Sequence, residues 1–112
     1  MTSRKVAKCI AGFADDKKAE DIVILDMRSV VNYCDYFVIC SGNNDRQIQA
    51  IVDGVDEGLL KQGFKYNFRN AAKSKEWVVL DLGDIVVHIF LKDRREFYGL
   101  EHLWQDAKKV AW

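Results

Sequence analysis

The chain has 112 residues, of which 49% are hydrophobic and 30% charged, and its 17 basic residues balance its 17 acidic ones. This length predicts one domain, residues 1–112, with a core that needs neither disulfides nor a metal. The balanced charge argues against a broad basic surface for nonspecific nucleic-acid binding, and no apolar run approaches the roughly 20 residues of a membrane helix.

The first half of the chain is expected to contain two helices and two strands. The apolar stripe in residues 3–19 predicts a helix that Ser3 can cap, and the short β-branched runs at 21–27 and 36–40 predict strands. Cys9, Cys34 and Cys40 lack C-x-x-C spacing, and we expect them to be small buried hydrophobic residues in a reducing compartment.

A second helix is predicted to follow the turn SGNND at 41–45, because Asn44 and Gln47 resemble a capping box. Gly63 is a natural end for this helix. Six residues are expected to form its buried stripe: Ile48, Ile51, Val52, Val55, Leu59 and Leu60. The turn itself lacks both glycine-rich phosphate-binding patterns, so a capping role is favoured over anion binding.

The second half is predicted to contain three strands and a last helix. Residues 65–70 indicate a weak edge strand, 71–76 a loop, and 76–91 a hairpin with Gly83-Asp84 at its turn.

The last helix is predicted at 93–106, where Asp93 and Glu96 resemble another capping box. Tyr98 and Glu101, three residues apart, should lie together on a more exposed side. Its core-facing stripe is predicted to be Phe97, Leu100, Leu103 and Trp104. The order α-β-β-α-β-β-β-α predicts an α/β fold with a mixed sheet of about five strands and flanking helices.

The hairpin register separates two faces. One face is wholly aliphatic and must be core, from the pairs Leu82–Ile85, Leu80–Val87 and Val78–Ile89. The other face, which we call the mixed face, has the pairs Asp81–Val86, Val79–His88 and Trp77–Phe90. Three interpretations of this face remain open: an Asp81–His88 pair satisfied beneath a helix, a surface that docks a partner, and a catalytic dyad, which lacks a third group.

Metal binding is not expected from the sequence. Asp81 and Asp84 flank the hairpin turn and could hold a cation, but Asp is also a favoured turn residue. His88 and His102 form neither H-x-x-x-H nor H-E-x-x-H, which argues against zinc. We therefore predict neither a metal nor a cofactor.

Three long blocks of the sequence carry a family resemblance: AEDIVILDM at 19–27, DYFVICSGNNDRQIQAI at 35–51, and EWVVLDLGDIVVHIFLKDRREFYGLEHLWQDA at 76–107. They resemble the ribosomal silencing factor family, also called the Iojap family, over roughly residues 17–107. Asn43 and Asn44 depart from it, because the family often has threonine and serine there.

The resemblance implies a nucleotidyltransferase-like fold without enzymatic activity. It further implies binding to large-subunit ribosomal protein fourteen, which blocks joining of the small and large subunits and represses translation when nutrients are short. A large-subunit assembly factor and a nucleotidyltransferase-like enzyme are the alternatives. Residues 1–10 have neither a signal-peptide core nor the length of a transit peptide, so the cytoplasmic, bacterial version is expected.

The enzyme alternative is disfavoured by spacing. Ser41-Gly42 reverses the Gly-Ser turn that nucleotidyltransferases use, and Asp81 and Asp84 are spaced D-x-x-D rather than D-x-D. A protein without an active site needs an affinity surface, which we expect to consist of Trp77, Asp81, His88, Phe90, Tyr98 and Glu101. The two acids would meet basic groups of the ribosomal protein. Minor ribosomal RNA contacts and a homodimer remain open.

Overall fold

The computed structural model describes residues 2–64, 69–73 and 76–112, with side chains described for 2–64 and 76–112. Of the edge strand expected at 65–70, residues 65–68 lie outside the described residues. The strand β3 (Arg69–Lys73) extends into the stretch expected to be a loop.

A mixed sheet forms the centre of the molecule, with strand order β3-β4-β5-β2-β1-β6. The other strands are β1 (Glu20–Asp26), β2 (Tyr36–Gly42), β4 (Trp77–Asp81), β5 (Ile85–Leu91) and β6 (Lys108–Val110). The central strands β2 and β5 are parallel, and the other neighbours are antiparallel. The predicted α/β class, element order and mixed sheet are confirmed, and the short β6, which pairs with β1, was not expected.

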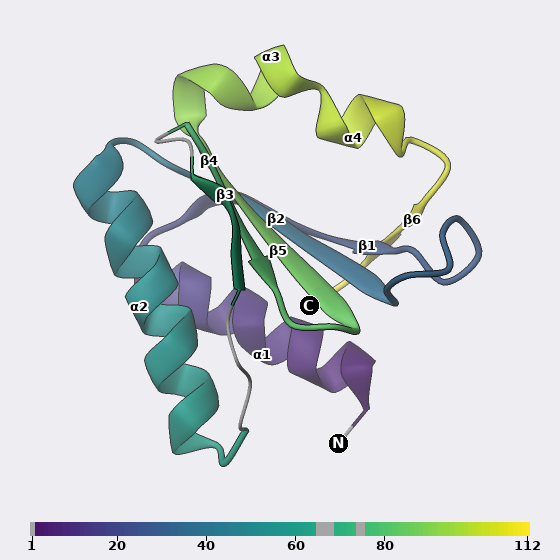
Figure 1. Ribbon diagram of the computed structural model, residues 1–112, viewed down its shortest axis with the longest axis horizontal. Coiled ribbons are helices and arrows are strands. Elements are labelled where there is room, and N and C mark those ends of the chain that lie inside the picture. Colours follow the sequence, from purple (N-terminus) through teal and green to yellow (C-terminus); the bar gives the residue numbers. More distant parts are fainter. Residues whose placement is uncertain (1, 65–68, 74–75) are drawn as a thin grey trace.

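Helices cover both faces of this sheet (Figure 1). The helices α1 (Ser3–Asp16) and α2 (Asp45–Lys61) lie on one face. A 3₁₀ turn η1 (Lys92–Arg94) and two short helices, α3 (Arg95–Tyr98) and α4 (Leu100–Leu103), lie on the other face, which carries the mixed face of the hairpin. Each face therefore has its own apolar core.

The helix caps differ in detail from the sequence expectation. Thr2, rather than Ser3, caps α1 by accepting from the Lys5 amide at 3.3 Å. The Ser3 hydroxyl instead donates to Asp35. At α2, Asn44 accepts from the Gln47 amide as predicted.

The buried stripe of α2 is shorter than expected. Leu60 is 60% exposed, whereas Ile48, Ile51, Val55 and Leu59 are buried. Successive residues on a helix point about 100° apart, so Leu60 lies off the stripe that Leu59 occupies.

The hairpin has the predicted register. β4 and β5 pair Trp77 with Phe90, Val79 with His88 and Asp81 with Val86, and the Leu82 amide donates to the Ile85 carbonyl at 2.9 Å. The aliphatic face is core, as expected: Leu80, Leu82, Ile85, Val87 and Ile89 are buried.

The last helix is not continuous, because Gly99 adopts a left-handed conformation with φ +60° and separates α3 from α4. A left-handed residue ends a helix, and glycine adopts this conformation easily because it has no Cβ to clash with the backbone. The break changes which side chains face the sheet. Phe97 and Leu103, expected in the core, are 69% and 68% exposed, whereas Leu100 is buried. No side-chain cap is formed by the Asp93–Glu96 pattern in this part of the structure.

Candidate functional site

The mixed face is organised in rows that run across the sheet. Strand pairing sets Trp77 beside Phe90, Phe90 beside Ser41, and Ser41 beside Glu20. The next two rows are Val79–His88–Ile39–Val23 and Asp81–Val86–Phe37–Leu25. Alternate side chains of a strand share one face, which places the residues of β4, β5 and β2 in these rows on a common surface. In β1 the register shifts between Glu20 and Val23, so alternation alone does not place Glu20.

An aromatic cluster occupies the β4–β5 side of this face. The Trp77 ring is stacked on Phe90, with centroids 5.0 Å apart, and lies 4.9 Å from the Tyr98 ring of α3. Its indole Nε1–H donates to Nδ1 of His88 at 3.1 Å. Offset and edge-on aromatic pairs of this kind contribute about 0.5–1.5 kcal/mol beyond their burial, so the indole is held in one orientation.

His88 is a neutral, buried group. Its side chain is 6% exposed, and burial lowers its pKa to about 4. Since Nδ1 accepts from Trp77, the neutral ring carries its proton on Nε2, which has no hydrogen-bond partner among the described residues. A ring that is neutral at pH 7 and buried acts here as the acceptor that orients Trp77, and it does not reach solvent as a base.

The six residues expected to form an affinity surface lie in different environments. Phe90 is fully buried and His88 nearly so. Trp77, Tyr98 and Glu101 are partly buried, and Asp81 is exposed. The structure therefore brings four of the residues, Trp77, His88, Phe90 and Tyr98, into one aromatic cluster that does not include the two acids.

The two acids each have a partner within the chain. Asp81 Oδ1 accepts from the Gly83 amide at 2.9 Å in the hairpin turn, so the Asp81–His88 pair weighed from the sequence is not the pairing that forms. Glu101 Oε1 accepts from Nε of Arg95 at 2.7 Å, in an ion pair in which the Glu101 side chain is 39% exposed. The second oxygen of each carboxylate takes no part in these two bonds.

The structure adds residues that sequence reasoning did not select. Val79 lies between Trp77 and Asp81 on the same face and is partly buried. The strict alternation of β4 could have found it, since it occupies the same face as its two neighbours. Arg95 carries no sequence pattern that sets it apart from the other basic residues, and only the fold reveals its partly buried contacts.

The groups that could hold a nucleotide or a metal are engaged elsewhere. At the start of α2 the Gln47 amide donates to Asn44, and the Asn43 amide donates to Gln47 Oε1. The Ser41 hydroxyl accepts from Arg95 at 2.9 Å. Within residues 2–64, 69–73 and 76–112, no group of three His, Cys, Asp or Glu side chains is placed to bind a metal ion.

Cysteine chemistry is suppressed by burial at two positions. Burial raises the pKa of Cys34 to about 11 and that of Cys40 to about 12, so both thiols are protonated at pH 7. Both are buried hydrophobic residues, as predicted, while Cys9 is partly buried. Of the helices that the structure describes, none has the length and apolar character to span a membrane.

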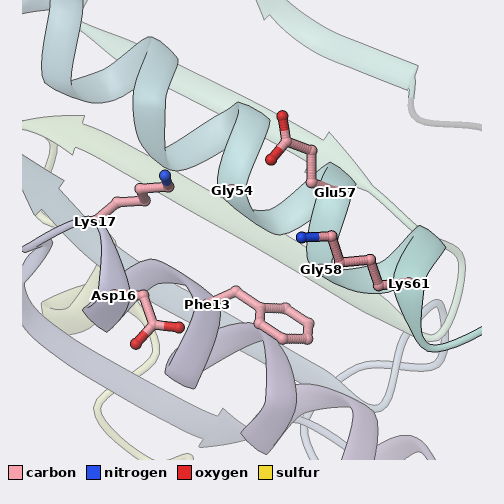
Figure 2. A pocket seen from close by; sticks show the side chains of 7 residues that line it. All are labelled: Phe13, Asp16, Lys17, Gly54, Glu57, Gly58 and Lys61. Carbon is pink, nitrogen blue, oxygen red and sulfur yellow. The ribbon is translucent and has the colours of Figure 1, made fainter.

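A hollow of about 260 Å³ lies between α1 and α2, on the opposite side of the sheet (Figure 2). Its shape follows from close helix packing. The Phe13 ring approaches Gly58 so closely that a Cβ at position 58 would lie 2.6 Å from the ring, and the Lys17 side chain approaches Gly54 in the same way. The charged groups at its rim are of both signs. We therefore regard the hollow as a helix-packing feature and the mixed face as the candidate functional site.

Comparisons with known proteins agree with this choice of fold and family. The sequence model of the family "Ribosomal silencing factor during starvation" matches residues 1–111. The chain is 43% identical to the ribosomal silencing factor RsfS of Bacillus subtilis over 107 residues, which cover 96% of this chain and 91% of that protein. It is 36% identical to the chloroplastic protein Iojap of Zea mays, covering 93% of this chain and 45% of that protein.

Solved structures give the same result. A crystal structure from Bacillus halodurans has a TM-score of 0.81 at 37% identity and covers 98% of this chain and 100% of that one. A protein from Chromobacterium violaceum has a TM-score of 0.85 at 28% identity, with coverage of 100% and 92%.

Proposed function

The chain belongs to the ribosomal silencing factor family, and from that premise we propose that it represses translation by binding the large ribosomal subunit and sterically blocking its joining to the small subunit. The proposed receptor is large-subunit ribosomal protein fourteen, on the surface where the small subunit docks. Family membership over residues 1–111 carries this proposal. The proposed site of action is the cytoplasm, where the ribosomes to be silenced are.

The proposed contact is made by three residues of the mixed face and one residue of α3, which together we call the docking surface: Trp77, Val79, Asp81 and Tyr98. Trp77 and Tyr98 are partly exposed rings that the chain holds in a fixed arrangement. Large, preorganised aromatic groups supply apolar area at low entropy cost, which is why they dominate the energy of many interfaces.

Charge gives the docking surface its polarity. The exposed Asp81 would face a basic group of the receptor, and such complementarity favours correct docking more than it adds affinity. Glu101 is left out of the docking surface because one of its oxygens is already bound by Arg95. His88 and Phe90 support the surface from beneath, because both are buried.

A steric role is also supported by the hydrogen bonds of the polar groups that a nucleotidyltransferase-like enzyme would use. The Ser41 hydroxyl, the amides at the start of α2 and the Asp81 carboxylate all have partners within the chain. We accordingly propose a protein that works by occupying a surface, with no reaction of its own.

The test is sedimentation of purified large subunits with the protein, before and after small subunits are added. The protein is expected with free large subunits and absent from joined ribosomes. Trp77→Ala should lower the bound fraction, whereas Trp112→Ala is the matched control, since Trp112 is a 49% exposed tryptophan whose Nε1 donates to the Ile22 carbonyl on β1. Equal binding by free subunits and joined ribosomes would contradict the proposal. Sedimentation of the protein alone separates a homodimer from a monomer.

A further inference from the structure

The single turn α3 spans the first row of the mixed face. Arg95 and Tyr98, its first and last residues, are three apart and so project to one side of a helix. Tyr98 lies over the β4–β5 end of the row, 4.9 Å from the Trp77 ring and 5.8 Å from the Phe90 ring. Arg95 lies over the other end, on Ser41 of β2 and Glu20 of β1.

Arg95 is a largely covered cation with several partners. Its side chain is 11% exposed, Nη1 donates to Ser41 Oγ at 2.9 Å and to the Glu20 carbonyl at 3.5 Å, and Nε donates to Glu101 at 2.7 Å. Charge-assisted bonds of this kind are stronger than neutral ones, and a buried arginine needs them because it cannot lose its charge. The guanidinium therefore joins α3 and α4 to the end of β2 and the start of β1.

The break at Gly99 is what allows the Glu101 contact. Residues six apart in an uninterrupted α-helix point about 120° away from each other and do not meet. The left-handed Gly99, between the two residues, turns α4 so that Glu101 returns to Arg95. The arginine is thereby fixed from the sheet side by Ser41 and from the helix side by Glu101.

The geometry points to Arg95 as a positioning residue for the docking surface: together with Ser41 it sets where Tyr98 lies over Trp77, without touching the receptor itself. This inference rests on the proposed function. Ser41 is 1% exposed, and in the described structure its hydroxyl bonds only to Arg95, so it has no surface to offer a partner. An effect of Ser41→Ala on binding would therefore be indirect, and the bond that the substitution removes is the one to Arg95.

The test compares two variants that disrupt the same bond from opposite ends. Ser41→Ala and Arg95→Met should each weaken binding to large subunits by about tenfold, and the double variant should also lose only about tenfold rather than a hundredfold, because residues that act through one contact are not additive. Arg28→Met is the matched control. Arg28 also forms a 2.7 Å ion pair, with Asp26, but it is exposed and lies against Tyr36, whose side chain belongs to the other core.

A spectroscopic measurement separates positioning from general stability. In ¹⁵N-labelled protein the indole N–H signal of Trp77 reports the surroundings of that ring, which include the His88 acceptor and the Tyr98 ring, and Trp77→Phe identifies the signal. We expect Ser41→Ala and Arg95→Met to shift it and Arg28→Met to leave it in place, with all three variants folded. Should Arg95→Met fail to fold, Ser41→Ala alone decides, since it removes one oxygen from a buried site.

The outcomes distinguish this inference from the proposed function. If the unaltered protein binds large subunits while Ser41→Ala and Arg95→Met bind equally well, or if their losses multiply in the double variant, Arg95 is not a positioning residue. If the unaltered protein does not bind large subunits, the proposed function fails. In that event an unmoved indole signal in Ser41→Ala would also overturn the positioning role, and a shifted signal would retain it.

Discussion

His88 should make the protein less stable as the pH falls from about 6.5 to 4. Burial lowers the pKa of His88 to about 4 in the folded chain, from an ordinary value of 6.5. A histidine with a lowered folded pKa contributes no penalty above pH 6.5, where it is neutral in both states. Below that pH the unfolded chain binds the proton first, so the free energy of unfolding decreases as the pH falls.

The size of the effect follows from the two pKa values. The loss attributable to His88 is about 2 kcal/mol at pH 5 and about 3 kcal/mol at pH 4. The rings that contact it, Trp77, Phe37 and Phe90, are uncharged, so no neighbouring carboxylate in these contacts offsets the penalty. Protonation of Nδ1 would also remove the acceptor of the Trp77 indole.

The assay is urea unfolding at pH 8, 7, 6, 5 and 4, followed by circular dichroism, for the unaltered protein and for His88→Phe. Phenylalanine keeps an aromatic ring at the site but cannot titrate, and the carboxylates contribute equally to both proteins. The difference between the two stability curves should be constant above pH 7 and should change by about 2 kcal/mol by pH 5. Parallel curves from pH 8 to pH 4 would refute the description of His88 as a buried neutral group.

Three further substitutions test other parts of the account. Trp77→Ala should weaken binding to large subunits about 30-fold, equivalent to about 2 kcal/mol, in a titration followed by sedimentation, and unchanged affinity would remove Trp77 from the docking surface. Gly58→Ala should lower the free energy of unfolding by about 1–3 kcal/mol in urea, because its Cβ would lie 2.6 Å from the Phe13 ring, and an unaltered midpoint would show that this ring moves freely. Gly99→Ala should cost about 1 kcal/mol and weaken binding, since φ +60° strains a residue with a Cβ, whereas equal stability would argue against the left-handed break.

The hairpin was predictable in detail because two independent signals agree on it. The Gly83-Asp84 turn sets which residues face each other, and the alternation of aliphatic side chains sets which face is core. A shift of one residue would exchange the faces, so the register observed at Trp77–Phe90 was strongly specified.

The last helix was predictable in position but not in rotation. The apolar spacing of Phe97, Leu100 and Leu103 fits one continuous helix, and only the left-handed backbone at Gly99 reveals that two short helices form instead. A glycine inside a helical pattern is compatible with either outcome, and tertiary contacts decide between them. Here the Arg95–Glu101 pair accompanies the break.

The hydrogen-bond partners within the candidate site could not be predicted, because the sequence does not show which of several possible partners a side chain will bond to. Asp81 and His88 lie on adjacent strands as expected, but they do not bond to each other. The Trp77 indole donates to the His88 imidazole, and the Gly83 amide donates to the Asp81 carboxylate. The strand β6 was missed because three residues, Lys108–Val110, carry too short a pattern to indicate a strand.

The most direct test of the proposed silencing role is subunit joining followed by light scattering. Small and large subunits are mixed after the large subunits have been incubated with the protein, with Trp77→Ala or with Trp112→Ala. The protein and Trp112→Ala should reduce the amplitude of joining in proportion to the large subunits they occupy, and Trp77→Ala should need about a 30-fold higher concentration for the same reduction. Full joining on large subunits that are saturated with the protein would contradict the proposed silencing role.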